Sequence, residues 1–139
     1  MGVYKDHIKD ALPSIKKVRD LKKKLESKGV KYIYSNWIDF LGSPKTKPMP
    51  ISDFEDLCMG KGPQFAVHSV SFVPELTPAD NDQIPVPDLD SLMICPWDKT
   101  CAWVFADLYW NDRPYDVCPR LTLKKQIQKS AKSDLKFYV

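Results

Sequence analysis

The sequence has no apolar run that approaches the roughly 18–20 residues that a helix needs to cross a bilayer. Residues 1–17 mix charged and apolar side chains and lack the apolar core of a secretory signal peptide. These absences predict no membrane partner and favour a cytoplasmic protein. With 43% hydrophobic and 28% charged residues among 139, the composition is typical of one globular domain with a modest core.

Metal-binding motifs are also missing. No two cysteines have C-x-x-C spacing, and His7 and His68 lie far apart in the sequence. Because structural zinc sites need closely spaced ligands, we predict no metal site in this chain and four reduced, mostly buried thiols. The aspartates between residues 80 and 90 lack the glycine and the closing glutamate of a calcium-binding EF-hand loop. The four cysteines are Cys58, Cys95, Cys101 and Cys118.

The excess of positive charge is small, with a formal net charge of +3. Much of it falls on one N-terminal segment in which no aromatic residue lies between the basic ones, whereas surfaces for single-stranded nucleic acid combine both kinds. We therefore interpret the segment as a solvated helix face and predict no nucleic-acid partner. The weaker alternative, a basic nucleic-acid-binding domain, would bind with a steep salt dependence. The basic residues are Lys16, Lys17, Arg19, Lys22, Lys23 and Lys24.

Helices are predicted from apolar periodicity and from capping residues. One apolar stripe recurs at three- and four-residue steps and predicts an amphipathic helix. Pro13 is expected to start its main part or to kink it, and Gly29 to end it in a left-handed cap. Ser52 and Glu55 match a capping box that would open a short second helix. The stripe consists of Ile8, Leu12, Ile15, Val18, Leu21 and Leu25.

Several segments have the β-branched and aromatic composition of strands. Gly42-Ser43-Pro44 predicts a turn between the first two, and Asn111-Asp112 a hairpin turn after the last. The proline- and acid-rich stretch 74–88 is expected to be an extended surface loop. Antiparallel strands with flanking helices predict an α+β fold, with a β-grasp-like antiparallel or mixed sheet. The strand segments are 30–40, 45–49, 65–73, 92–95 and 101–109.

We divide the chain into a helical segment, residues 1–29, a β-grasp domain, residues 30–118, and a final segment, residues 119–139. Pro119 is expected to open a helix in the final segment. Residues 135–139 have the composition of a new strand, whereas natural termini are more often polar. This end predicts that the sequence is a piece of a longer protein.

Several short motifs follow one another along the chain. Val30-Lys31-Tyr32-Ile33 opens a strand that ends in D-x-x-G at Asp39-Phe40-Leu41-Gly42, and Lys45 follows. The later motifs are Pro87-Asp88, Pro96-Trp97, the A-W-V-x-A-D run at residues 102–107 and the P-R-x-x-L-K helix start at residues 119–124. In this order, over residues 30–139, the motifs resemble the N-terminal domain of the glutamine synthetase family. Leu76-Thr77-Pro78-Ala79 and the A-W-V-x-A-D run resemble its branch of type III enzymes and glutamate–methylamine ligases.

The resemblance implies an ATP-dependent ligase that forms a γ-glutamyl amide from glutamate and ammonia, or a small organic amine, through γ-glutamyl phosphate. ATP and Mg²⁺ or Mn²⁺ would bind to a catalytic domain beyond this sequence, so residues 1–139 alone are expected to be inactive. The family forms homo-oligomers of stacked rings in which the N-terminal domain completes the active site of the neighbouring subunit. A stand-alone β-grasp interaction module without catalysis is the alternative.

Asp39 has two interpretations. From the residues alone, a carboxylate between a strand and a Gly/Pro turn is a turn residue that accepts backbone N–H groups. The resemblance implies instead that Asp39 is catalytic and binds the amine as its ammonium ion, because a carboxylate attracts the cation and can help to remove a proton. Lys45 is interpreted as a solvated hairpin lysine, although a contact at a subunit boundary stays open. Arg120 is expected to pair with a carboxylate.

The chain departs from the family where F-D-G-S-S is replaced by Phe65-Ala66-Val67-His68-Ser69. In the family this loop lies at the amine end of the site, so the resemblance implies that His68 and Ser69 bind substrate. The lost carboxylate weakens selection for ammonium, and Val67 and His68 would suit a larger organic amine. A purely structural role for His68 stays open.

Overall fold

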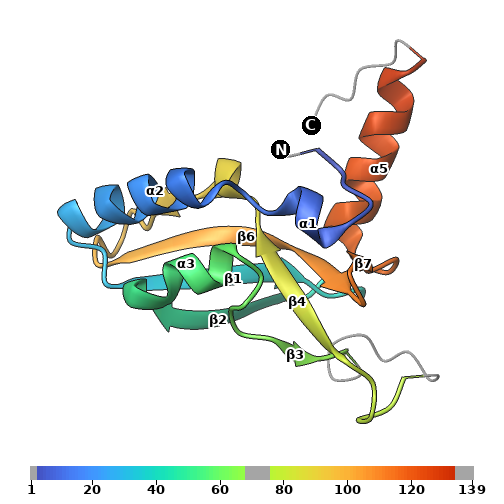
Figure 1. The fold of residues 1–139 in the computed structure, drawn as a ribbon, viewed down its shortest axis with the longest axis horizontal. Helices are drawn as coiled ribbons and strands as arrows, with labels where there is room; N and C mark the ends of the chain where they lie inside the picture. Colours follow the sequence, from blue (N-terminus) through green and yellow to red (C-terminus); the bar gives the residue numbers. More distant parts are fainter. Residues whose placement is uncertain (1–2, 68–75, 134–139) are drawn as a thin grey trace.

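The computed structural model of the chain describes residues 3–67 and 76–133, which form a curled sheet with flanking helices (Figure 1). The strand order in the described part is β2-β1-β6-β4-β3, and both β5 and β7 pair with β6. β1 and β6 are parallel, whereas the other pairs are antiparallel. This mixed sheet confirms the predicted α+β, β-grasp-like class. The strands are β1 (Tyr32–Ile38), β2 (Pro44–Pro50), β3 (Phe65–Ala66), β4 (Asp82–Pro87), β5 (Met93–Ile94), β6 (Cys101–Trp110) and β7 (Arg113–Pro114).

The helices cover two regions of the sheet. α2 and α3 pack together over β1 and β6, whereas α1 and α5 lie toward the β7 end of β6 (Figure 1). In the described ranges, no helix combines the length and the apolar character needed to span a membrane. The helices are α1 (Ile8–Ala11), α2 (Ile15–Ser27), α3 (Phe54–Cys58) and α5 (Pro119–Ala131), with 3-10 turns at Ile51–Asp53 and Leu89–Ser91.

The predicted first helix is two helices. Leu12 is extended, with φ −69° and ψ 134°, because the residue before a proline is disfavoured in the helical region. Pro13 therefore precedes the main helix instead of opening it, and Ser14 is the N-cap, whose hydroxyl accepts the Lys17 N–H at 3.4 Å. Gly29 has a positive φ of 83° and follows the helix end, as predicted.

The capping box predicted for the second helix is wrong. The Ser52 hydroxyl bonds to the Asp53 carboxylate at 2.6 Å instead of a backbone N–H. The Glu55 carboxylate does not reach back to the chain before it, because it pairs with Arg19 of α2 at 3.0 Å. A contact between two helices thus replaces the local cap. The helix ends at Cys58, shortly before Gly60, which has a positive φ of 72°.

The loop predicted for residues 74–88 is wrong in its second half, where β4 runs beside β6. Its prolines stand at every second position, Pro85 and Pro87. The register pairs Val86 with Asp107, and the Asp88 N–H continues the ladder by donating to the Phe105 carbonyl at 2.8 Å. The prolines therefore direct their nitrogens away from β6, where the missing N–H breaks no ladder bond.

Three predicted strands and the predicted hairpin turn are present in the structure. β1, β2 and β6 form the predicted strands, and Asn111 and Asp112 make the predicted hairpin turn, with positive φ values of 49° and 63°. The strand predicted over 65–73 extends over Phe65–Ala66 in the structure, and residues 68–73 lie outside the described ranges. So does the strand-like end, 135–139. Among the described residues all four cysteines are buried, free thiols.

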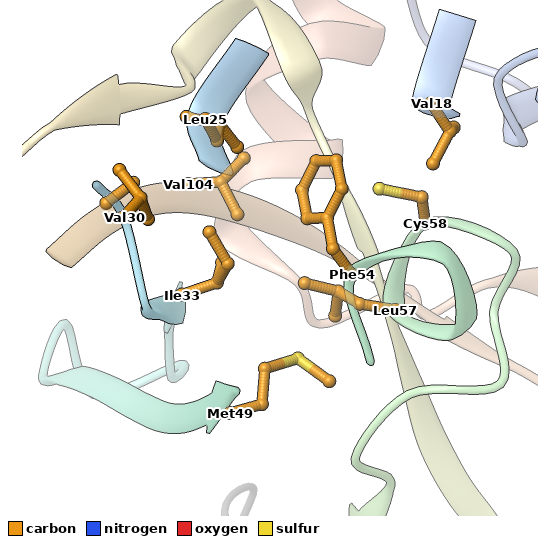
Figure 2. Packing of buried hydrophobic residues seen from close by; sticks show 10 residues of the cluster. Val18, Leu25, Val30, Ile33, Met49, Phe54, Leu57, Cys58 and Val104 are labelled. Atoms are coloured by element: carbon orange, nitrogen blue, oxygen red, sulfur yellow. The ribbon is translucent and has the colours of Figure 1, made fainter. Parts of the chain in front are cut away.

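The core consists of two clusters. The first lies where α2 and α3 cover β1 and β6 and includes the fully buried Phe54, Ile33 and Val18 (Figure 2). The second joins β4 and β6 to α5 and includes Tyr109 and Leu121. Removing the Phe54 side chain would leave a cavity that costs about 3–5 kcal/mol. The two clusters hold the β1–β2 hairpin and the last helix on the same sheet.

Candidate functional site

The candidate site is the end of the β1–β2 hairpin, where Asp39 follows the last residue of β1. Asp39 closes the turn. Its N–H donates to the Ser43 carbonyl at 3.0 Å, and its Oδ1 accepts the Ser43 N–H at 2.8 Å. Gly42, with φ at 83°, donates its N–H to the Asp39 carbonyl at 3.0 Å. The turn role inferred from the residues alone is therefore confirmed, and it immobilises one carboxylate oxygen.

The second carboxylate oxygen, Oδ2, lies 3.5 Å from the Lys45 Nζ. The Asp39 side chain is 3% exposed and that of Lys45 is 44% exposed. Lys45 is exposed on the hairpin, as predicted, and the hairpin also places its ammonium group against Asp39. A buried carboxylate that holds a primary ammonium group has the chemistry needed to bind ammonium or an alkylammonium ion.

An aromatic stack ties this hairpin to the segment that leads toward the other predicted site residues. Trp37 and Phe65 are parallel, with ring centroids 4.3 Å apart. The Lys47 ammonium donates to the Gln64 carbonyl at 2.6 Å and lies 5.7 Å from the Phe65 centroid. The strand before Asp39 is thereby held beside the start of the substituted F-D-G-S-S segment. His68 and Ser69 lie outside the described residues.

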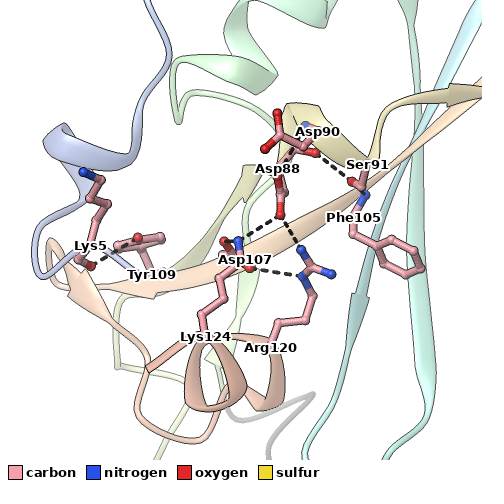
Figure 3. A network of polar contacts seen from close by, with 9 residues as sticks. All are labelled: Lys5, Asp88, Asp90, Ser91, Phe105, Asp107, Tyr109, Arg120 and Lys124. Carbon is pink, nitrogen blue, oxygen red and sulfur yellow. Dashed lines mark hydrogen bonds and ion pairs between the residues drawn. The ribbon is translucent and has the colours of Figure 1, made fainter. Parts of the chain in front are cut away.

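A buried charge cluster joins the last helix to the sheet (Figure 3). Arg120 contacts Asp88 at 2.6 Å and Asp107 at 3.1 Å, which confirms the predicted carboxylate partner of Arg120. Lys124 bonds to Asp88 at 2.9 Å and also to Asp107. Two carboxylates and two cations balance each other, as buried charges require.

Sequence reasoning missed Lys124 and the shared use of both aspartates. A usable pattern was present, because Arg120 and Lys124 are four residues apart and so lie on one face of a helix. The Arg120 guanidinium also lies 5.3 Å from the centroid of the Phe105 ring. These contacts fix the orientation of α5, the element that leaves the sheet at the C-terminal end of the described chain.

The requirements of a metal site are not met in the described part of the chain. Across residues 3–67 and 76–133, no group of three or more His, Cys, Asp or Glu side chains is placed to hold a metal ion. Asp88 and Asp107 already share two cations. The described residues therefore contain no metal centre.

Comparison with known proteins supports a family assignment. No family model matches the chain. It is 35% identical over 117 residues to glutamine synthetase of Rhizobium meliloti (strain 1021), a match that covers 84% of this chain and 26% of that protein. It is 30% identical over 106 residues to glutamate–methylamine ligase of Methyloversatilis universalis, covering 75% of this chain and 23% of that protein.

Solved structures agree. A GmaS/ADP complex and a GmaS structure without ligand each match with a TM-score of 0.75 and 30% identity. Each match covers 83% of this chain, and 26% and 27% of the respective structures. The chain thus spans about a quarter of the length of the relatives it matches. It belongs to the glutamine synthetase family of ligases, in which it corresponds to the N-terminal domain.

Proposed function

We propose that the chain is the N-terminal part of an ATP-dependent ligase that joins the γ-carboxylate of glutamate to ammonia or a small organic amine. The observation that carries the proposal is the buried Asp39 carboxylate with the Lys45 ammonium 3.5 Å away. Relatives named glutamine synthetase and glutamate–methylamine ligase support the reaction class. When bound to the complete enzyme, ATP would supply the phosphoryl group that activates glutamate as γ-glutamyl phosphate, and Mg²⁺ or Mn²⁺ would stabilise its negative charge.

Asp39 would act on the amine. The incoming amine binds as its ammonium ion against Oδ2, while Oδ1 stays bonded to the Ser43 N–H. Asp39 then accepts a proton, and the neutral amine attacks the acyl carbon of γ-glutamyl phosphate. The new C–N bond replaces the C–O bond to phosphate, which leaves. Lys45 must first move away from Asp39. The free-energy cost of this displacement is small, because the Lys45 side chain is half-exposed and its ammonium lies beyond hydrogen-bond length.

The site would be completed by a neighbouring subunit. Phe40 and Leu41 at the tip of the hairpin are exposed, with 42% and 65% of their surface accessible. Apolar side chains beside a reactive carboxylate favour a cover that excludes water. This supports a homo-oligomer of stacked rings in which Asp39 acts in the active site of the next subunit.

We further propose the division into residues 1–29, 30–118 and 119–139, with α5 leading toward the catalytic domain. The substituted loop favours an organic amine over ammonium. Ala66 and Val67 stand where the family has an acidic residue and a glycine, so charge is lost and apolar volume is gained. The glutamate–methylamine ligase among the relatives supports this preference.

The test is to measure phosphate release from ATP by the full-length protein, with glutamate and with ammonium or methylamine. Asp39→Asn keeps an oxygen to accept the Ser43 N–H but removes the charge. We expect it to lower kcat/KM for the amine by roughly 10²–10⁴-fold, the usual contribution of a general base, with the KM for ATP unchanged. Asp20→Asn, on the exposed face of α2, is the matched control and should retain activity.

Unchanged amine turnover in Asp39→Asn would refute the role of Asp39 while leaving the ligase assignment intact. Absence of any amine- and glutamate-dependent phosphate release from the wild-type protein would refute the ligase. The alternative, a β-grasp interaction module, would then account for the domain.

A further inference from the structure

Cys95 and Cys101 face each other across the β5–β6 ladder. The register pairs Met93 with Trp103 and Ile94 with Ala102, so one further step places the two cysteines opposite each other. The Cys95 N–H donates to the Cys101 carbonyl at 2.9 Å, which extends the ladder to this pair. Directly opposed residues project from the same face with Cα atoms about 5.5 Å apart, the separation most common in disulfides.

Both thiols line one pocket of about 300 Å³ on the face of the sheet. The Cys95 residue is 2% exposed and Cys101 is 6% exposed. Trp97, which is 74% exposed, stands at the same pocket and meets Trp103 edge to face at 5.9 Å. A water molecule occupies about 30 Å³ in the liquid, so the pocket has room for a molecule the size of hydrogen peroxide.

The surroundings of Cys95 disfavour its thiolate. Burial raises the pKa of the Cys95 thiol, and the nearby Cys101 and Asp98 raise it further. The Cys101 thiol donates to an Asp98 oxygen at 3.3 Å. Hydrogen bonds from Thr100 lower the pKa of Asp98, which therefore stays charged at neutral pH. Since the thiolate is the reactive form, oxidation should quicken as the pH rises.

We propose that Cys95 and Cys101 are a paired modification site that a small hydroperoxide converts into a reversible disulfide. The more accessible Cys101 sulfur attacks one peroxide oxygen, the O–O bond breaks, and a sulfenic acid forms as water leaves. The Cys95 sulfur then attacks the Cys101 sulfur, the S–O bond breaks, and a second water leaves. Two thiols and one hydrogen peroxide thus give one disulfide and two waters, with sulfur oxidised and peroxide reduced.

The other two cysteines provide internal controls. Cys58 is fully buried in α3, and burial raises its pKa to about 12. Cys118 precedes α5 and packs in the second core cluster. Cys58 lies in α3 and Cys118 precedes α5, so neither stands opposite a cysteine at the end of a strand ladder. Selective linkage of Cys95 to Cys101 would therefore show that strand register determines which thiols join, whereas general thiol oxidation would also involve Cys58 and Cys118.

The experiment exposes the full-length protein to hydrogen peroxide at pH 7 and pH 9, blocks free thiols by alkylation and maps tryptic peptides without reduction. Cys95 is the only cysteine of peptide 62–99, whereas Cys101 shares peptide 100–120 with Cys118, because trypsin does not cleave before Pro114. We expect the two peptides to be linked with the loss of two hydrogens, faster at pH 9, and separated again by dithiothreitol.

Variants assign the bond. Linkage should persist in Cys118→Ala and vanish in Cys101→Ala, and fragment ions of the linked wild-type peptides give the same assignment without any variant. Linkage through Cys118 would overturn the proposal. So would full alkylation of Cys95 and Cys101 in the unfolded, peroxide-treated protein, or their conversion to sulfinic acids without a bond. None of these readouts depends on ligase activity.

Discussion

Replacing Lys124 by methionine tests whether the buried charge cluster holds α5 on the sheet. The Lys124 side chain is 3% exposed and its ammonium bonds to both Asp88 and Asp107. Methionine nearly preserves the length and volume of the side chain but leaves two carboxylates to one guanidinium. Breaking a buried ion pair in this way costs about 3–5 kcal/mol, since one charge is left uncompensated. Arg120 still contacts both carboxylates, which places the expected loss near the lower limit, about 3 kcal/mol.

Hydrogen exchange in the full-length protein measures this loss locally. A loss of about 3 kcal/mol makes opening roughly 10²-fold more frequent, so amides of α5 should exchange about 10²-fold faster. Lys129→Met is the matched control, because Lys129 is exposed on the last turn of the same helix. Its loss should cost no more than about 1 kcal/mol.

A double variant tests the cause. Adding Asp107→Asn to Lys124→Met leaves one carboxylate and one guanidinium, so protection of α5 should partly return even though a further charge has been removed. Two results would refute the charge-imbalance explanation. One is a change of less than about fivefold in the hydrogen exchange of α5 in Lys124→Met. The other is a further acceleration of that exchange when Asp107→Asn is added.

Two further variants test the hairpin and the core. Lys45→Met frees the Asp39 carboxylate from a half-exposed ion pair worth about 1 kcal/mol, so steady-state kinetics of the full-length enzyme should show a KM for the amine about fivefold lower. Lys99→Met, in another exposed turn, should leave that KM unchanged, and a raised KM in Lys45→Met would contradict competition for Asp39. Phe54→Ala should destabilise the domain by about 3–5 kcal/mol and accelerate hydrogen exchange in β1 and β6, because Phe54 is fully buried in the core. Val117→Ala, at an exposed position, is the control and should change hydrogen exchange little. Unchanged exchange in Phe54→Ala would contradict the contribution of Phe54 to the core.

Local sequence determined the features that depend on a few consecutive residues. The apolar stripe predicted most of α2, and Pro119 predicted the start of α5. Gly29 and the Asn111-Asp112 pair predicted two of the places where the described chain has a positive φ. Such features follow from periodicity and from the dihedral angles that each residue type tolerates. The order of short motifs also indicated the family, because a motif is itself a local property.

Tertiary structure alone decided which side chains meet. Glu55 pairs with Arg19 on another helix instead of forming the predicted cap. The proline-rich segment forms β4, because only the edge that pairs with β6 needs N–H donors. The register of the hairpin placed Lys45 against Asp39, and packing of α5 buried Lys124 against Asp88 and Asp107. These pairings join residues whose distance depends on strand register and helix orientation, which the spacing of residues along the chain does not specify.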